Sequence, residues 1–134
     1  MCGIAGIVGS PGSQSRISAM TAALRHRGPD ESGIYLDDGA ALGHTRLSII
    51  DLSSGTQPIH NEDKNLWIVF NGEIFNYPEL REDLIAKGHC FYTTTDTEVI
   101  LHLYEEKGVE CLNELNGQFA FAIWDSRKKT CFLS

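Results

Sequence analysis

Positive charge is scarce in this sequence, and long apolar runs are missing from it. Lysine and arginine number 11 against 18 aspartates and glutamates, which gives a formal net charge of −7. Nucleic acids and anionic membranes attract basic surfaces, so neither is an expected partner. The longest apolar stretches, such as 66–70 and 119–124, fall far short of the roughly 18 residues of a membrane-spanning helix. We therefore expect no membrane span.

Metal-ligand spacing and targeting signals are also missing. The four cysteines stand at positions 2, 90, 111 and 131 without a CxxC pair, and the five histidines are scattered along the chain. This spacing predicts no metal site. No basic region followed by a long apolar run opens the chain, so we expect no secretory signal. A cytoplasmic location with reduced cysteines is the consequence.

Short, mixed elements predict one α+β domain in the 134 residues, which contain no repeat or linker. Apolar or alternating runs predict strands at 4–8, 33–36, 40–44, 47–50, 66–70, 118–124 and 130–133. Helical spacing of apolar residues predicts helices at 17–24, from Pro78 to Gly88, from Thr95 to Gly108, and at 109–115. The sequence DDG at 37–39 predicts an antiparallel hairpin. Together these elements favour an antiparallel sheet covered by helices.

The second residue offers unusual chemistry if Met1 is removed. Cys2 would then carry a free α-amine with a pKa of about 7.7 to 8.0 beside a thiol with a pKa of about 8.5. One residue would hold a nucleophile and a base that both work near neutral pH. From these two residues alone, an accidental cysteine before an ordinary strand is the preferred interpretation. Gly3 and Gly6 favour the functional one, since glycine in a strand lets a backbone or substrate approach closely.

Two polar motifs have both a structural and a functional interpretation. Arg46 lies in GHTRLSIID, where its guanidinium needs an anion. That anion is either a protein carboxylate, which is the simpler interpretation, or a substrate carboxylate. Asn71 and Gly72 in NGEIFNY are first of all a turn signal. An Asn amide and a neighbouring Gly N–H are also two neutral donors that can converge on one oxygen, as an oxyanion hole requires.

The ends of two expected helices carry further polar residues. RHRGPD at 25–30 has the composition of a helix end, with arginines that complement the helix dipole. Thr95 and Glu98 have the spacing of a capping box. Asp96, between them, is favoured by the dipole or holds a substrate ammonium group. Together with Cys2 and Arg46, these residues supply the groups needed by an amidase that acts on an α-amino acid.

Six motifs, in this order, resemble the N-terminal glutaminase domain of glutamine-dependent asparagine synthetases: MCGIAGI, RHRGPD, HTRLSIID, NGEIFNY, TDTEV and NGQFAFAIWD. The resemblance covers residues 2–134. That family belongs to the class II glutamine amidotransferases of the N-terminal nucleophile hydrolase superfamily. The resemblance therefore implies a four-layer αββα fold in which two antiparallel sheets pack between helices.

The resemblance also implies a role for each site residue. Cys2 would attack the side-chain amide of glutamine, with its α-amine as base, and form a thioester that water hydrolyses after ammonia leaves. Asn71 and Gly72 would hold the oxyanion. Arg46 would bind the α-carboxylate, and Glu73 with Asp96 the α-ammonium group. The implied glutamine pocket consists of Arg46, Leu47, Ser48, Ile49, Ile50, Asn71, Gly72, Glu73 and Asp96.

In the resembling family, the ammonia passes to a C-terminal synthetase domain that uses ATP and magnesium to convert aspartate to asparagine. The chain has no Ser-Gly-Gly-x-Asp-Ser loop, so we assign no cofactor to it and expect a synthetase domain in cis. Because the family continues the sheet beyond Ser134, we expect an incomplete glutaminase domain. Open alternatives are a homodimer, another ammonia acceptor, another amide substrate, and a non-catalytic module with the same fold.

Overall fold

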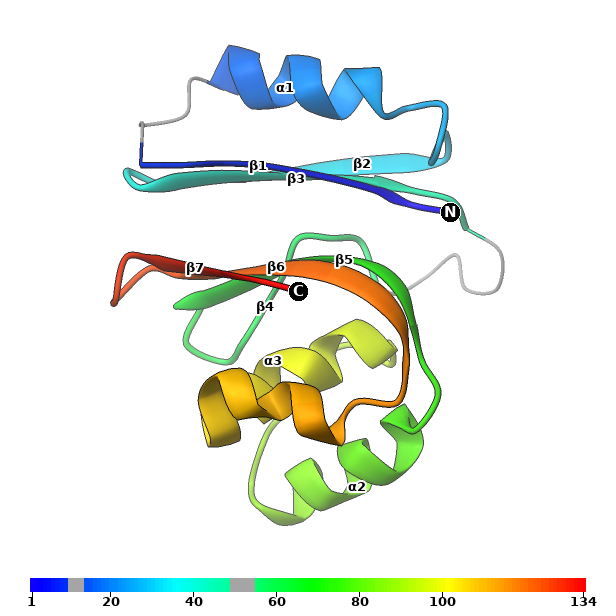
Figure 1. Ribbon diagram of the computed structural model, residues 1–134, viewed down its shortest axis with the longest axis vertical. Helices are drawn as coiled ribbons and strands as arrows, with labels where there is room; N and C mark the ends of the chain where they lie inside the picture. Colours follow the sequence, from blue (N-terminus) through cyan, green and yellow to red (C-terminus); the bar gives the residue numbers. More distant parts are fainter. Residues whose placement is uncertain (10–13, 49–54) are drawn as a thin grey trace.

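Two antiparallel sheets lie face to face in the computed structural model, which describes residues 1–9, 14–48 and 55–134 (Figure 1). In spatial order, the first sheet contains β1 (Gly3–Val8), β3 (Ala40–Arg46) and β2 (Glu31–Leu36). The second contains β4 (Ile59–His60), β5 (Leu66–Ile74), β6 (Gly117–Asp125) and β7 (Thr130–Leu133).

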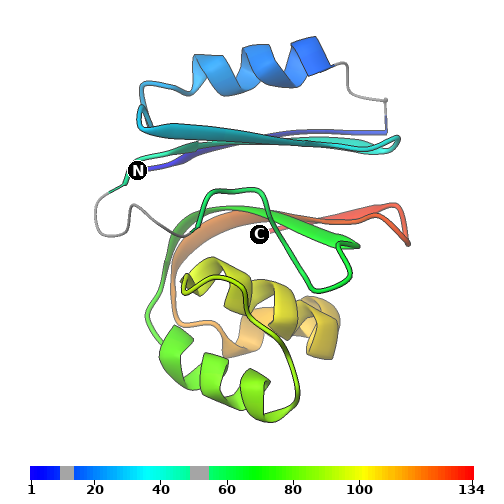
Figure 2. The same ribbon diagram turned by 180° about the vertical axis from the view of Figure 1, so that it is seen from behind.

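Helices cover the outer face of each sheet. The helix α1 (Gln14–Ala23) lies on the first sheet. The second is covered by α2 (Tyr77–Ala86), α3 (Asp96–Lys107) and the 3₁₀ helix η1 (Gly108–Glu114). The view from behind shows the same order of layers (Figure 2). This is the expected α+β fold of four layers, αββα.

The central strand of the first sheet explains why the layers pack closely. Every residue of β3 from Ala40 to Thr45 is buried, because α1 covers one face and the second sheet the other. A Cβ atom at Gly43 would lie 2.1 Å from Oγ1 of Thr21 on α1. Only glycine therefore lets α1 approach the sheet this closely.

Two groups of apolar side chains form the core. The larger group lies between the second sheet and its helices and includes Ile68, Phe70, Leu84, Ile100 and Phe121. The smaller group, which includes residues of both sheets, consists of Ala40, Leu42, Val69, Ala122 and Trp124. No helix in the described part of the chain is long and apolar enough to cross a bilayer.

Most predicted elements are present, and the differences have local causes. The hairpin of β2 and β3 forms as expected. The expected strand at 47–50 is wrong for Leu47 and Ser48, because the Ser48 N–H donates to Asp30 Oδ2 at 2.7 Å instead of joining a ladder. Ile49 and Ile50 lie outside the described residues. The two-residue strand β4 was not expected.

The capping box at the start of α3 is also wrong. Thr95 is the N-cap but makes no side-chain capping bond. Glu98 is buried, and its carboxylate accepts the backbone N–H of Thr93 at 2.7 Å and of Tyr92 at 3.0 Å. The Glu98 carboxylate is thus bonded to the loop before α3, and not to the N-cap residue as a capping box requires. At the other end, Gly108 ends α3 as expected, with φ of 57°.

Candidate active site

A cleft of about 700 Å³ contains the predicted nucleophile. Its walls come from the two residues before β1, from Leu47 just after β3, and from the region of the paired strands β5 and β6. The lining residues are Met1, Cys2, Leu47, Asn71, Gly72, Glu73, Phe75, Gln118, Phe119 and Ala120. Five residues of the predicted site therefore share one cleft, although they come from three separate segments of the sequence.

Arg27 holds the backbone of the predicted nucleophile, Cys2. Its Nε donates to the carbonyl oxygen of Cys2 at 3.1 Å, and both residues are partly buried. The sequence suggested only that Arg27 complements a helix dipole, so its contact with Cys2 was missed. The RHRGPD motif was the available signal for it.

The same motif fixes the segment after β3. A Cβ atom at Gly28 would lie 2.5 Å from the backbone nitrogen of Arg46, so glycine permits this close approach. The Asp30 N–H donates to the Arg46 carbonyl at 3.1 Å, and the Asp30 carboxylate accepts the Ser48 N–H. RHRGPD therefore positions Cys2 and the segment 46–48 together.

Arg46 and Ser48 lie beside the cleft rather than in its lining. Arg46 Nη1 lies 3.2 Å from Glu31 Oε2, which is the protein carboxylate that its burial requires. Oγ of Ser48 is buried and has no hydrogen-bond partner among the described residues. A buried hydroxyl without a hydrogen-bond partner costs free energy. The Ser48 hydroxyl is therefore available to form a hydrogen bond with a ligand.

Asn71 and Gly72 belong to a strand, so their interpretation as a turn is wrong. They pair with Ala120 and Phe119 in the ladder between β5 and β6. A Cβ atom at Gly72 would lie 2.2 Å from the carbonyl oxygen of Gln118. Position 72 therefore admits only glycine. Gln118 and Phe119 also line the cleft, and the sequence did not assign them to the site.

Glu73, which lines the cleft, and Asp96, which lies outside its lining, form an acidic pair. Asp96 Oδ2 accepts the N–H of Ile74 at 2.9 Å, which ties the start of α3 to β5. Burial raises the pKa of Asp96, and the nearby charge of Glu73 raises it further. A cation bound beside Asp96 would favour the charged form of its carboxyl group.

A family comparison identifies the class of domain. The family model described as a glutamine amidotransferase domain matches residues 1–134. The chain belongs to this family. As a glutamine amidotransferase domain, it has the fold that its sequence motifs implied. All four cysteines of the domain are free thiols, of which Cys111 is buried and Cys90 exposed.

Curated relatives of this glutamine amidotransferase domain are longer proteins. Asparagine synthetase [glutamine-hydrolyzing] 3 of Arabidopsis thaliana is 48% identical over 134 residues, which is 97% of this chain and 23% of that protein. Asparagine synthetase [glutamine-hydrolyzing] 2 of Bacillus subtilis is 42% identical over 139 residues, 99% of this chain and 18% of that protein. The chain thus spans about a quarter or less of these relatives.

Solved structures support the fold of the domain. An allosteric regulatory enzyme of purine biosynthesis superimposes with a TM-score of 0.75 and 24% identity, over 92% of this chain and 35% of that one. Glutamine phosphoribosylpyrophosphate amidotransferase from B. subtilis superimposes with a TM-score of 0.66, also at 24% identity, over 93% of this chain and 35% of that one. The domain therefore shares its αββα fold with these two enzymes.

Proposed function

We propose that this domain hydrolyses L-glutamine to glutamate and ammonia, with Cys2 as the nucleophile after removal of Met1. The observation that carries the proposal is the shared cleft of Cys2, Asn71 and Gly72. A thiol that shares a cleft with neutral hydrogen-bond donors suits acyl transfer, which needs a nucleophile and a stabilised oxyanion. Membership of the glutamine amidotransferase domain family supports glutamine as the source of the acyl group.

In this mechanism, the free amine of Cys2 accepts the thiol proton as the sulfur attacks the side-chain amide carbon of glutamine. The Asn71 amide and the Gly72 N–H hold the oxyanion. The proton passes to the departing nitrogen, ammonia leaves, and a γ-glutamyl thioester remains. Water then adds to the thioester, the thiol is released, and glutamate forms. Arg27 keeps the Cys2 backbone in place through the bond to its carbonyl.

The residues around the cleft suit an α-amino acid. We assign the α-carboxylate to Arg46, which already contacts Glu31 and is held by the backbone bonds of RHRGPD. The unpartnered hydroxyl of Ser48 is a second donor on the same segment. We assign the α-ammonium group to Glu73 and Asp96, whose mutual repulsion it would relieve. Leu47 lines the cleft, and we retain Ile49 and Ile50 in the proposed pocket on the resemblance alone.

We also propose that the ammonia serves conversion of aspartate to asparagine in a cytoplasmic protein. Support comes from the relatives, which are named asparagine synthetases and are several times longer than this chain. A synthetase domain in cis would supply the sites for ATP and magnesium, neither of which we assign to the described residues. A homodimer remains an open alternative.

The decisive experiment replaces Cys2. In the purified protein with Met1 removed, Cys2→Ala should reduce glutamate release from glutamine to background, and ammonia-dependent synthesis in the complete enzyme should persist. Cys90→Ser is the matched control, because Cys90 is an exposed thiol that does not line the cleft.

Two results would contradict the proposal. The first is glutamate release by Cys2→Ala at the parental rate. The second is a fully active protein in which mass spectrometry finds Met1 retained, since the amine of Cys2 would then be an amide and have no basicity.

A further inference from the structure

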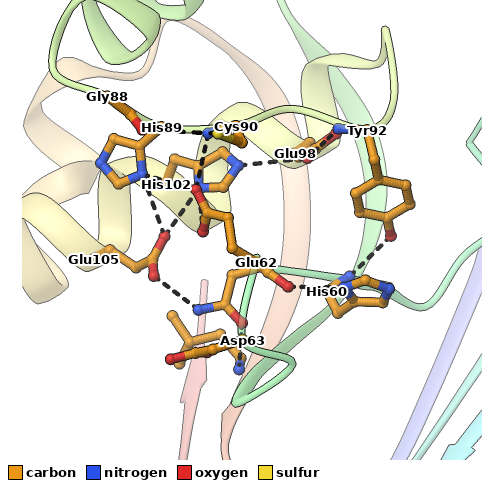
Figure 3. A network of polar contacts seen from close by, with 12 residues as sticks. His60, Glu62, Asp63, Gly88, His89, Cys90, Tyr92, Glu98, His102 and Glu105 are labelled. Atoms are coloured by element: carbon orange, nitrogen blue, oxygen red, sulfur yellow. Dashed lines mark hydrogen bonds and ion pairs between the residues drawn. The ribbon is translucent and has the colours of Figure 1, made fainter.

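Two histidines and two glutamates meet on the helical side of the second sheet (Figure 3). We call Glu62, His89, His102 and Glu105 the His–Glu cluster. Glu62 lies in the turn between β4 and β5, and His89 in the segment between α2 and α3. His102 and Glu105 lie one turn apart on α3. None of the four lines the cleft around Cys2.

The inner atoms of the cluster lie at the separations of metal ligands. His89 Nδ1 lies 3.4 Å from Glu62 Oε1 and 3.6 Å from Glu105 Oε2. His102 Nδ1 lies 3.5 Å from Glu62 Oε2 and 2.9 Å from Glu105 Oε2. Ligands at about 2.1 Å from a tetrahedral metal ion are about 3.4 Å from each other. One ion therefore fits between the four side chains with small adjustments.

The outer nitrogen of each histidine faces another carboxylate. His102 Nε2 lies 3.4 Å from Glu98 Oε1, and His89 Nε2 lies 3.0 Å from Glu106 Oε1. When Nδ1 of each ring binds a metal ion, the single hydrogen of the neutral ring is on Nε2, where the outer carboxylate accepts it. An outer carboxylate that orients a ligating histidine in this way is the common arrangement in metal sites.

The two inner carboxylates are oriented as well. Glu105 Oε1 accepts the side-chain N–H of Asn61 at 2.7 Å, and Glu62 Oε1 accepts the backbone N–H of Cys90 at 3.0 Å. His102 is fully buried, so the cluster reaches below the protein surface. Counting Glu98 and Glu106, carboxylates outnumber imidazoles two to one. The net charge of these four glutamates and two histidines stays negative even if both rings are protonated and the ammonium group of Lys87, 3.8 Å from Glu106, is counted with them.

We propose that the His–Glu cluster binds one divalent transition-metal ion such as Zn²⁺, through Nδ1 of both histidines and one oxygen of each glutamate. Imidazole and carboxylate donors suit Zn²⁺, whereas Ca²⁺ and Mg²⁺ prefer oxygen ligands alone. Four protein ligands close the coordination shell, which is typical of a structural ion rather than a catalytic one. The ion joins the β4–β5 turn, the α2–α3 segment and α3. The spacing of the histidines did not predict this site, because three separate segments supply the ligands.

The test measures metal binding and stability on the full chain, after a chelator has removed bound metal. Calorimetric titration with Zn²⁺ should give one tight site. At a free Zn²⁺ concentration of about 100 times the dissociation constant, the melting temperature should rise by about 5 to 10 °C. His89→Gln should weaken binding at least about tenfold and remove the rise in melting temperature. His89 is close to the surface, so this variant is expected to fold even if His102→Gln does not.

Matched variants separate the cluster from other zinc ligands in the chain. His26→Gln removes an exposed histidine in the turn that follows α1, and Cys90→Ser removes the exposed thiol beside His89. Both variants should bind Zn²⁺ as the parent does. Three results would overturn the proposal. The first is a melting temperature that does not change with Zn²⁺. The second is unchanged tight binding in the double variant His89→Gln, Glu105→Gln, and the third is loss of the site in Cys90→Ser. The first would leave the cluster as a network of ion pairs.

Discussion

At the scale of single residues, the position of the Cys2 backbone matters to the proposed mechanism as much as the Cys2 thiol. Cys2 stands one residue before β1, where few ladder bonds restrain it. Arg27 supplies the missing restraint from 25 residues away through a charged hydrogen bond to the Cys2 carbonyl. Attack on an amide requires the sulfur and the oxyanion donors to be held within about half an ångström of the productive geometry. Arg27 is therefore a positioning residue in the proposed mechanism.

Arg27→Gln should lower kcat for glutamine hydrolysis by about tenfold to a hundredfold, because hydrogen bonds from charged groups contribute about 1.5 to 3 kcal/mol. KM should change little, since Arg27 does not line the cleft. Arg25→Gln is the control, because Arg25 belongs to the same motif and is exposed. Steady-state kinetics of both variants provide the measurement. A rise in KM without a fall in kcat would assign Arg27 to substrate binding instead.

Residue types allow a prediction of the chemistry of the site, whereas its contacts are not visible in the sequence. Cys2, Asn71 and Gly72 were identified because few residue types supply a nucleophile or paired neutral donors. The bond from Arg27 to Cys2 and the contact of Arg46 with Glu31 were not predictable, since each joins residues at least 15 positions apart. The tight fit at Gly72 depends on the backbone of β6, which local sequence does not reveal.

At the scale of elements, β3 and β5 are connected by a buried histidine. His44 on β3 is 1% exposed, and its Nε2 donates to the Phe70 carbonyl of β5 at 3.2 Å. Because a carbonyl only accepts, Nε2 carries the hydrogen. Burial lowers the pKa of His44 from 6.5 to about 4, and the bond to Phe70 opposes this only in part. The neutral ring is thus a condition for close packing of the two sheets.

Stability should therefore fall in acid through His44. Its folded pKa of about 4 is lower than the unfolded value of 6.5, so its contribution is complete above pH 6.5 and is lost as the pH falls toward 4. The loss is up to about 3 kcal/mol. Urea unfolding of the parent and of His44→Gln, measured from pH 7 to 4, provides the test. A glutamine amide still donates to Phe70 and does not titrate. Equal pH slopes in the two proteins would contradict this role.

Elements with local signals were predictable, and those that depend on distant partners were not. The hairpin of β2 and β3 follows from three turn residues, and both helix ends at Gly88 and Gly108 follow from glycine. The strand expected at 47–50 does not form at Leu47 and Ser48, because the partner of Ser48 is Asp30 rather than a strand. Glu98 does not act as a capping residue, because its carboxylate instead accepts backbone N–H groups of the loop five and six residues before it.

At the scale of the whole molecule, Trp124 connects the two sheets. Its ring lies in the smaller core, and its indole N–H donates to Asp37 Oδ2 in the β2–β3 turn at 2.6 Å. Burial alone would raise the pKa of Asp37, but this bond and the N–H groups of Gly39 and Ala40 lower it. One side chain of the second sheet thus stabilises the turn of the first.

Trp124→Phe should lower the free energy of unfolding by roughly 2 to 4 kcal/mol, because it removes a hydrogen bond to a charged group and leaves a cavity. Trp67→Phe is the control. The indole N–H of Trp67 donates to Lys64 within its own turn, so its loss should cost less than about 1.5 kcal/mol. Urea unfolding followed by circular dichroism gives both values. An equal loss in the two variants would show that the link between sheets carries no special stability.

The strand that contains Asn71 and Gly72 also affects how the protein ages. In an Asn-Gly sequence, the glycine nitrogen can attack the asparagine side chain and convert it slowly to aspartate, but only if the backbone turns to bring the two together. Pairing with β6 holds both residues extended and prevents that turn. Peptide mass spectrometry after long storage should find Asn71 intact in folded protein and deamidated in urea. The ladder that builds the proposed oxyanion site thus also preserves its amide from the chain's own chemistry.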